Sequence, residues 1–296
     1  MNALSAAPVV DGLNRLANRY DIALCDVWGV VHDGRQSFPA ACDALSRFRA
    51  GGGTVVLITN APRPNAPIRA QLDHLHVPRD AYDAVVTSGD VTIELIRARG
   101  RAAAYHIGPS RDLVLFDEVA KLSGAPPPLA DLDNSSYVLC TGLFDDTRET
   151  PADYDQTLST MLTRDMPMVC ANPDLVIHRG QDLIYCAGAL ADRYEKMGGE
   201  AIYAGKPHGP IYEEALARAR VLRSGAFDKS RVVAIGDAMR TDVAGALAQG
   251  IDALFVASGI HRDEIGGVGA LDAAAFEQFA ARHGQRPTAI IEALVW

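Results

Sequence analysis

Four short apolar runs of the sequence are each followed by a polar side chain that can take part in chemistry. These side chains are Asp26, Thr59 with the adjacent Asn60, Lys206 in a Gly-Lys-Pro turn, and Asp237. A carboxylate nucleophile, a hydroxyl, an ammonium group and further carboxylates are what phosphoryl transfer through an aspartyl-phosphate requires. Singly, each side chain has a plain structural alternative, such as a helix cap or a surface turn. Together, they predict a site for a phosphorylated ligand.

The spacing of apolar residues predicts elements that bring such side chains to one edge of a sheet. Residues 22–25, 54–58 and 84–87 are typical of short buried strands, and helices are expected over 39–49 and 65–75. With right-handed crossovers, this β-α-β-α-β order places the carboxyl ends of the strands at the same edge. Open α/β sheets bind ligands in the crevice beyond these strand ends.

A second α/β pattern interrupts the first from about residue 91. Strand-like runs that end in Gly or Asn-Pro turns follow one another, and the first pattern resumes near Ala201. The predicted fold class is therefore α/β, with a doubly wound parallel-sheet (Rossmann-like) core over residues 1–90 and 203–296 and an inserted α/β cap domain over residues 91–202. Apolar residues at helical spacing also predict a short amphipathic helix over residues 8–20.

Charge and composition exclude several classes of partner. The net charge of -9 leaves no basic stripe for a nucleic-acid backbone. The longest apolar runs fall short of a membrane span, and the N-terminal residues 1–8 lack the features of a signal peptide. Five cysteines without a CxxC pair favour reduced thiols. We expect a cytoplasmic protein with a small-molecule partner, and with neither nucleic acid nor membrane as a partner.

In order and spacing, these residues resemble the motifs of the haloacid dehalogenase-like (HAD) hydrolase superfamily, specifically its class IIA phosphatases with an inserted C2-type cap. The four matching segments are Asp26-Val-Trp-Gly-Val, Leu57-Ile-Thr59-Asn60, Ala204-Gly-Lys206-Pro and Gly236-Asp237-Ala-Met-Arg-Thr-Asp242, and the cap is matched through Asn172-Pro-Asp174 and Gly188-Ala-Leu190. Members of this class hydrolyse phosphate esters of nucleotides, sugars and pyridoxal. The resemblance covers nearly the whole chain.

The resemblance implies a Mg²⁺-dependent phosphatase of a small phosphorylated metabolite. Asp26 is expected to attack phosphorus and form the aspartyl-phosphate. Mg²⁺ would be held by Asp26, Asp237 and the backbone carbonyl of Trp28, and Asp242 would orient the waters of the metal. A divalent cation is needed because the phosphoryl oxygens otherwise repel the incoming carboxylate.

Further roles follow from the same resemblance. Lys206 is expected to pair with the nucleophile and the phosphoryl group, and Thr59 and the amide of Asn60 would donate hydrogen bonds to the phosphoryl oxygens. Phe144 and Asn172, on loops of the cap, are expected to contact the substrate. A cap-mediated homodimer would also fit the family.

Trp28 departs from the family pattern. Most phosphatases of the superfamily carry an Asp at this position, which protonates the leaving oxygen and then activates water, whereas indole exchanges no proton at neutral pH. Losing such a group typically costs about 10²–10⁴-fold in rate. Three outcomes remain open: an enzyme restricted to phosphates with good leaving groups, replacement of the missing group by His32 or Asp33, or a phosphometabolite-binding or regulatory protein with weakened catalysis.

Overall fold

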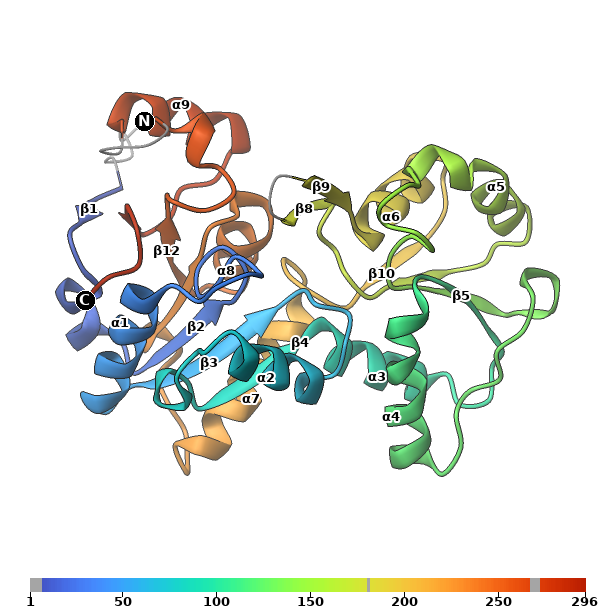
Figure 1. Ribbon diagram of the computed structural model, residues 1–296, viewed down its shortest axis with the longest axis horizontal. Coiled ribbons are helices and arrows are strands. Elements are labelled where there is room, and N and C mark those ends of the chain that lie inside the picture. Colours follow the sequence, from blue (N-terminus) through green and yellow to red (C-terminus); the bar gives the residue numbers. More distant parts are fainter. Residues whose placement is uncertain (1–6, 180–181, 267–271) are drawn as a thin grey trace. The chain divides into compact units, whose positions relative to one another are not determined.

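The structure is a computed structural model that describes residues 7–179, 182–266 and 272–296 (Figure 1). The expected absence of a signal peptide concerns mainly residues 1–6, which lie outside the described residues. The chain divides into two compact units. The first comprises Met1–Thr59, Ala70–Val86 and Tyr212–Trp296, and the second comprises Asn60–Arg69 and Thr87–Ile211. The assignment of residues 91–202 as a cap domain stays a prediction.

A seven-stranded sheet forms the centre of the first unit, in the order β1-β13-β12-β11-β2-β3-β4. Its strands are β1 Val9–Val10, β2 Ile22–Asp26, β3 Thr54–Thr59, β4 Ala84–Thr87, β11 Val232–Gly236, β12 Asp252–Val256 and β13 Ala289–Ile291. Every residue of β2, β3 and β11 is buried, which explains their continuous apolar sequences. Both β11 and β3 pair with β2 in parallel. The predicted parallel sheet is confirmed, and β2 and β3 end at the same edge.

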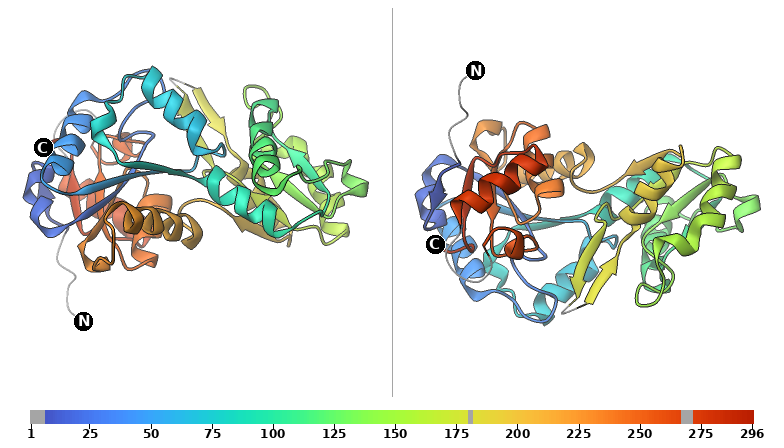
Figure 2. Two further views of the ribbon diagram at one scale, coloured as in Figure 1. Left: turned by 90° about the horizontal axis from the view of Figure 1, so that it is seen from below. Right: turned by 90° about the horizontal axis from the view of Figure 1, so that it is seen from above.

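Helices cover both faces of this sheet (Figure 2). They are α1 Pro39–Ala50, α2 Asn65–His74, α7 Gly209–Leu222, α8 Ala244–Ala248 and α9 Ala273–His283. Because crossovers between parallel strands are right-handed, α1 and α2 lie on one face, and α8 and α9, whose strands advance in the opposite direction, lie on the other. Figure 2 shows α7 on this second face as well. The doubly wound arrangement predicted from the sequence is thus confirmed.

The helix predicted over residues 8–20 is wrong. Val9 and Val10 instead form β1, which extends the sheet by pairing in parallel with β13, and two short 3-10 turns follow. Gly12 is extended, with a φ of -171°, and the Leu13 N–H donates to the carbonyl of Val295 at 2.7 Å. Pairing with the C-terminal segment therefore outweighs a local helical preference, and apolar spacing alone carries no information about that segment.

The second unit contains a four-stranded parallel sheet in the order β10-β7-β6-β5. Its elements are α3 Ser88–Ala98, β5 Ala104–Ile107, α4 Val114–Ser123, β6 Tyr137–Cys140, α5 Asp155–Thr163, β7 Met168–Cys170, the antiparallel hairpin of β8 Val176–Arg179 and β9 Asp182–Tyr185, α6 Ala187–Lys196 and β10 Ala201–Tyr203. Along β6, Val138 and Cys140 pack with α5 and α6, whereas Tyr137 and Leu139 pack with α3 and α4. This alternation gives the sheet an apolar core on each face.

The expectation of reduced thiols is confirmed, because all five cysteines are buried and free of disulfides. Burial raises the pKa of the Cys42 thiol to about 11, so this sulfur stays protonated at neutral pH. In the described part of the chain, every helix is too short or too polar to cross a lipid bilayer.

Candidate active site

Three buried carboxylates meet beyond the carboxyl ends of β2 and β11. Asp26 is the last residue of β2, and Asp237 directly follows β11, which pairs with β2 so that Ile235 aligns with Cys25. Asp242 lies one turn further along the chain. Each of the three residues offers a carboxylate oxygen, and these oxygens lie within 4.8 Å of one another. The structure thus brings together Asp26 and Asp237, the two carboxylates predicted to follow strands, and places Asp242 beside them.

Asp237 is held by backbone on two sides. The N–H of Ile260 donates to Asp237 Oδ2 at 2.8 Å. A Cβ atom at Gly29 would lie 2.1 Å from that oxygen, and one at Gly259 would lie 2.0 Å from it. Gly29 also has a φ of +85°, in the region that favours glycine. The loop after β2 and the turn after β12 therefore approach this carboxylate as closely as they do only because both positions lack a side chain.

Asp242 shapes the turn that carries Asp237. Its Oδ2 accepts the N–H of Ala238 at 3.0 Å, and a Cβ atom at Gly236 would lie 2.2 Å from its Cγ. The hydroxyl of Tyr212 donates to the carbonyl of Asp242 at 3.3 Å. These contacts position the turn over residues 237–242, and the predicted role of Asp242 towards the waters of a metal stays a prediction.

The donor set of the trio suits a divalent cation of the Mg²⁺ type. Carboxylate oxygens are the hard ligands that this ion prefers. Where carboxylates lie this close together and are shielded from solvent, a bound cation would offset the repulsion between their charges. Direct binding of such an ion by Asp26 and Asp237 stays a prediction. The Trp28 carbonyl as a third ligand stays a prediction.

Thr59 ends β3, the neighbour of β2, and its side chain is buried. The register aligns Ile58 with Asp26, so the hydroxyl lies one residue further along at the same sheet edge. This is the placement that the sequence predicted for a donor to phosphoryl oxygens.

Asn60, which follows Thr59 in the chain, organises a polar cluster in the second unit. Its Oδ1 accepts the N–H of Lys206 at 2.7 Å, and its Nδ2 donates to the carbonyl of Lys206 at 3.1 Å and to Asp174 Oδ1 at 2.9 Å. Asn172 Oδ1 accepts the N–H of Asp174 at 3.1 Å. The side chain of Asn60 therefore positions the backbone of Lys206. Its backbone amide as a phosphoryl ligand, and the pairing of the Lys206 ammonium with Asp26, stay predictions.

The predicted substrate contacts Phe144 and Asn172 follow adjacent strands of the second unit, β6 and β7. Phe144 is 47% exposed and stacks on Tyr154, with ring centroids 5.8 Å apart. Asn172 is buried within the cluster around Asn60. The two residues thus differ. Phe144 presents an accessible aromatic ring, whereas the side chain of Asn172 bonds the backbone of its own loop.

Trp28 lies in a folded loop with His32. The two rings meet edge to face with centroids 5.3 Å apart, and a Cβ atom at Gly34 would lie 2.4 Å from the indole. His32 is buried, and its Nδ1 accepts the N–H of Gly34 at 3.0 Å. Burial lowers the pKa of His32 to about 4, so the ring is neutral at pH 7. A buried, neutral imidazole whose Nδ1 is already bonded is not the protonated acid that would replace the missing Asp.

Asp33 also lacks the properties of a general acid. Burial raises the pKa of its carboxyl, but hydrogen bonds from the backbone N–H groups of Gln36 and Arg35 outweigh this effect and leave the pKa below its usual value. Asp33 is therefore ionised at neutral pH. Both alternatives to the missing Asp have a structural role in the loop after β2.

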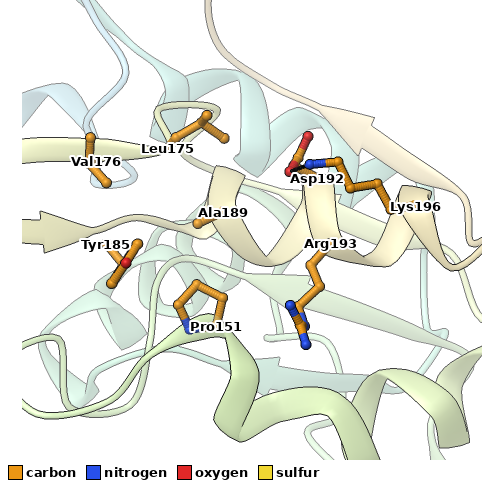
Figure 3. A pocket seen from close by; sticks show the side chains of 8 residues that line it. All are labelled: Pro151, Leu175, Val176, Tyr185, Ala189, Asp192, Arg193 and Lys196. Carbon is orange, nitrogen blue, oxygen red and sulfur yellow. Dashed lines mark hydrogen bonds and ion pairs between the residues drawn. The ribbon is translucent and has the colours of Figure 1, made fainter.

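None of the predicted site residues lines a hollow of about 330 Å³ in the second unit. It is lined by Pro151, Leu175, Val176, Tyr185, Ala189, Asp192, Arg193 and Lys196 (Figure 3). Figure 3 shows Tyr185 and Pro151 at one end and Arg193 at the other. Arg193 pairs with Asp155, and Lys196 pairs with Asp192. These ion pairs account for the charged residues of the wall, so the hollow adds no catalytic group.

Comparison with known proteins decides the family. A family model described as haloacid dehalogenase-like hydrolase matches residues 23–120, and one described as HAD-hydrolase-like matches residues 203–292. The crystal structure of a hydrolase of the haloacid dehalogenase-like family from Brucella suis 1330 is 46% identical in sequence. The match covers 97% of this chain and 100% of that chain, with a TM-score of 0.85. This chain belongs to the haloacid dehalogenase-like family of hydrolases.

Two more distant relatives of this HAD-family chain are phosphatases. The ribonucleotide monophosphatase NagD of Escherichia coli (strain K12) is 26% identical over 239 residues, which cover 80% of this chain and 87% of that protein. The D-glycerol 3-phosphate phosphatase of Mycobacterium tuberculosis is 26% identical over 251 residues, which cover 84% of this chain and 66% of that protein. The prediction of a phosphoric monoester hydrolase is confirmed at this level, whereas the names of the two relatives differ in substrate.

Sequence reasoning missed the groups that hold Asp237. The Ile260 N–H is a backbone donor, and no residue type signals it. Gly259 could have been found, because it is a glycine in a turn that closely follows an apolar strand and so lies at the same sheet edge.

Proposed function

We propose that this HAD-family phosphatase hydrolyses a small phosphorylated metabolite through an aspartyl-phosphate on Asp26, with Mg²⁺ held by Asp26, Asp237 and the carbonyl of Trp28. The observation that carries the proposal is the meeting of Asp26, Asp237 and Asp242 within 4.8 Å at one sheet edge. A carboxylate in this position can act as the nucleophile, and its neighbours can hold the cation that makes attack on an anionic phosphate feasible.

The reaction has two displacements at phosphorus. An oxygen of Asp26 attacks the phosphorus, the bond from phosphorus to the leaving oxygen breaks, and the leaving group departs with that electron pair. A water oxygen then attacks the same phosphorus and loses a proton to solvent. The acyl phosphate bond breaks, inorganic phosphate leaves, and Asp26 returns as a carboxylate. When bound, Mg²⁺ supplies the positive charge that screens Asp26 from the phosphoryl oxygens.

Thr59 and Lys206 are proposed to stabilise the charge that spreads over the phosphoryl oxygens in the transition state. The Thr59 hydroxyl lies one residue beyond the register partner of Asp26, which supports its role as a donor. Asn60 supports Lys206 indirectly, since its amide group bonds both the N–H and the carbonyl of that residue. Asn60 is therefore proposed as a positioning residue, and Phe144 as an accessible contact for the substrate.

The leaving group is proposed to need little protonation. The indole N–H of Trp28 does not ionise at neutral pH, His32 is buried and neutral, and Asp33 is ionised. Acyl, enol or aryl phosphates release an anion that is already stabilised, so they fit a site without a general acid.

The test is the substitution Asp26→Asn, assayed with Mg²⁺ on acetyl phosphate and 4-nitrophenyl phosphate. Phosphate release should fall by about 10⁴-fold or more, because an amide oxygen is a poor nucleophile. Asp43→Asn, at an exposed carboxylate of α1 that pairs with Arg47, is the matched control and should keep the parent rate.

Mass spectrometry after an acid quench supplies a second measurement. A phosphoryl group should appear on the peptide that contains Asp26 in the parent protein and be absent in Asp26→Asn. Parent-like turnover by Asp26→Asn would show that the nucleophile lies elsewhere. If the parent protein turns over no substrate of such a panel but is stabilised by one of them, the binding or regulatory alternative is favoured.

A further inference from the structure

A second group of metal-ligating side chains lies in the first unit, apart from the carboxylate trio. His261, Glu264 and His283 each offer one ligand atom, and these atoms lie within 4.8 Å of one another. His261 directly precedes a 3-10 turn that spans Arg262–Glu264, and His283 is the last residue of α9. Residues far apart in the sequence therefore present two imidazoles and one carboxylate at a common point.

Aromatic packing fixes both imidazoles. The ring of Phe279, one turn before His283 on α9, lies 4.7 Å from the His261 ring and 4.6 Å from the His283 ring, centroid to centroid. Phe279 in turn packs on Phe255 of β12, with ring centroids 6.0 Å apart, and this contact anchors α9 to the sheet. Because Phe279 contacts both rings, neither imidazole can rotate freely, and this reduces the entropy lost when a ligand binds them.

Glu264 completes the set and leaves it accessible. Its Oε1 lies 2.7 Å from His261 Nδ1, and its side chain is 46% exposed, whereas that of His261 is 16% exposed. An ion can therefore enter from the side of the carboxylate, and water can fill a remaining coordination position. Arg282 lies 3.7 Å from the other oxygen of Glu264, but its side chain is 61% exposed and has room to move away.

We propose that His261, Glu264 and His283 form a zinc site with water as the fourth ligand. Two nitrogens and one carboxylate oxygen are a donor set that zinc accepts in tetrahedral geometry, whereas Mg²⁺ prefers oxygen ligands throughout. The proposed site thus differs in chemistry from the carboxylate trio and is independent of the reaction proposed for Asp26. It lies next to the active site in sequence, because His261 follows Ile260, whose N–H holds Asp237.

The test is metal binding by the full-length protein carrying Asp26→Asn, which weakens binding at the carboxylate trio. Zinc is titrated against a chromophoric chelator in this background and in the same background with Glu264→Gln or His283→Gln. Each of these changes removes a proposed ligand with little change in shape, and Glu264 is exposed, so folding should be retained. The matched control is His74→Gln, at an exposed histidine of α2.

We expect one tightly bound zinc ion in the background protein and in His74→Gln, and affinity about 100-fold weaker or worse in Glu264→Gln and His283→Gln. Co²⁺ in place of zinc should give the intense visible bands of a tetrahedral site, which an all-oxygen octahedral site does not give. Equal zinc affinity in all four proteins, or equal loss in His74→Gln, would overturn the proposal. So would a Co²⁺ spectrum of octahedral type.

Discussion

At the scale of single residues, we propose that Trp28 decides which phosphate esters the enzyme can cleave. Its indole packs over Gly34 and against the edge of His32. An apolar ring therefore stands two residues after Asp26, in the loop that follows β2. The indole N–H of Trp28 does not ionise at neutral pH, His32 is neutral and Asp33 is ionised, so none of the three is a general acid. On this proposal, the intrinsic stability of the leaving anion determines the rate of the first displacement.

The substitution Trp28→Asp should raise turnover of an alkyl phosphate such as glycerol 3-phosphate by about 10²-fold or more, because a carboxyl group can protonate the alkoxide. Turnover of 4-nitrophenyl phosphate should change much less, since its leaving group needs no proton. Trp28→Phe keeps an aromatic ring but supplies no general acid, and it is the control. Steady-state rates of phosphate release give the comparison, and an alkyl phosphatase activity of Trp28→Asp no higher than that of Trp28→Phe would contradict the prediction.

The residues of the candidate site divide into those that the sequence reveals and those that it does not. Asp26 and Asp237 were predictable because each follows a short apolar run, and parallel strands bring such positions to one edge. The Ile260 N–H was not predictable, since every residue except proline carries this donor. The hydrogen bond from the Lys206 N–H to the Asn60 side chain could not be predicted either, because the two residues are 146 positions apart in the sequence.

At the scale of elements, the order of strands and helices follows from the sequence wherever both faces of a strand are buried. The buried strands β2, β3 and β11 have nearly continuous apolar sequences, and this pattern correctly predicted a parallel sheet. The prediction of a helix over residues 8–20 was wrong, because β1 is a two-residue edge strand. Its pairing with β13 depends on the other end of the chain. The β8–β9 hairpin was missed too, since its strands are short and β9 is largely exposed.

The loop after β2 owes its geometry to Gly29, and Gly29→Ala should weaken both metal binding and turnover. A left-handed φ of +85° costs an alanine about 1–2 kcal/mol of stability, and its Cβ would lie 2.1 Å from Asp237 Oδ2, so this carboxylate has to move. Gly52→Ala, at a φ of +92° with no heavy atom within 4 Å of the added Cβ, separates the two effects. Both variants should lose thermal stability, but only Gly29→Ala should need more Mg²⁺ for half-maximal activity. An unchanged Mg²⁺ requirement in Gly29→Ala would show that Asp237 tolerates displacement.

At the scale of the whole molecule, each compact unit contains a histidine whose pKa is lowered strongly by burial. His32 lies in the first unit and His106 in the second, and burial lowers the pKa of each to about 4, from an ordinary value of 6.5. Each ring also has a specific partner, since His32 Nδ1 accepts the Gly34 N–H and His106 Nε2 lies 3.0 Å from Thr141 Oγ1. In each unit, protonation of this buried histidine at low pH should therefore lower the stability of the fold.

Stability should fall as the pH drops from 6.5 towards 4, because the unfolded chain takes up protons at these histidines that the folded chain excludes. At pH 5 the cost is about 1–2 kcal/mol for each histidine. His32→Asn and His106→Gln place an amide atom near the bonded ring nitrogen without a titrating group, so each should reduce the loss between pH 7 and pH 5 by that amount. Because the two residues lie in different units, the reductions should add in the double variant. Urea unfolding at the two pH values measures the effect, and losses equal to those of the parent protein in both variants would place the source of acid sensitivity elsewhere.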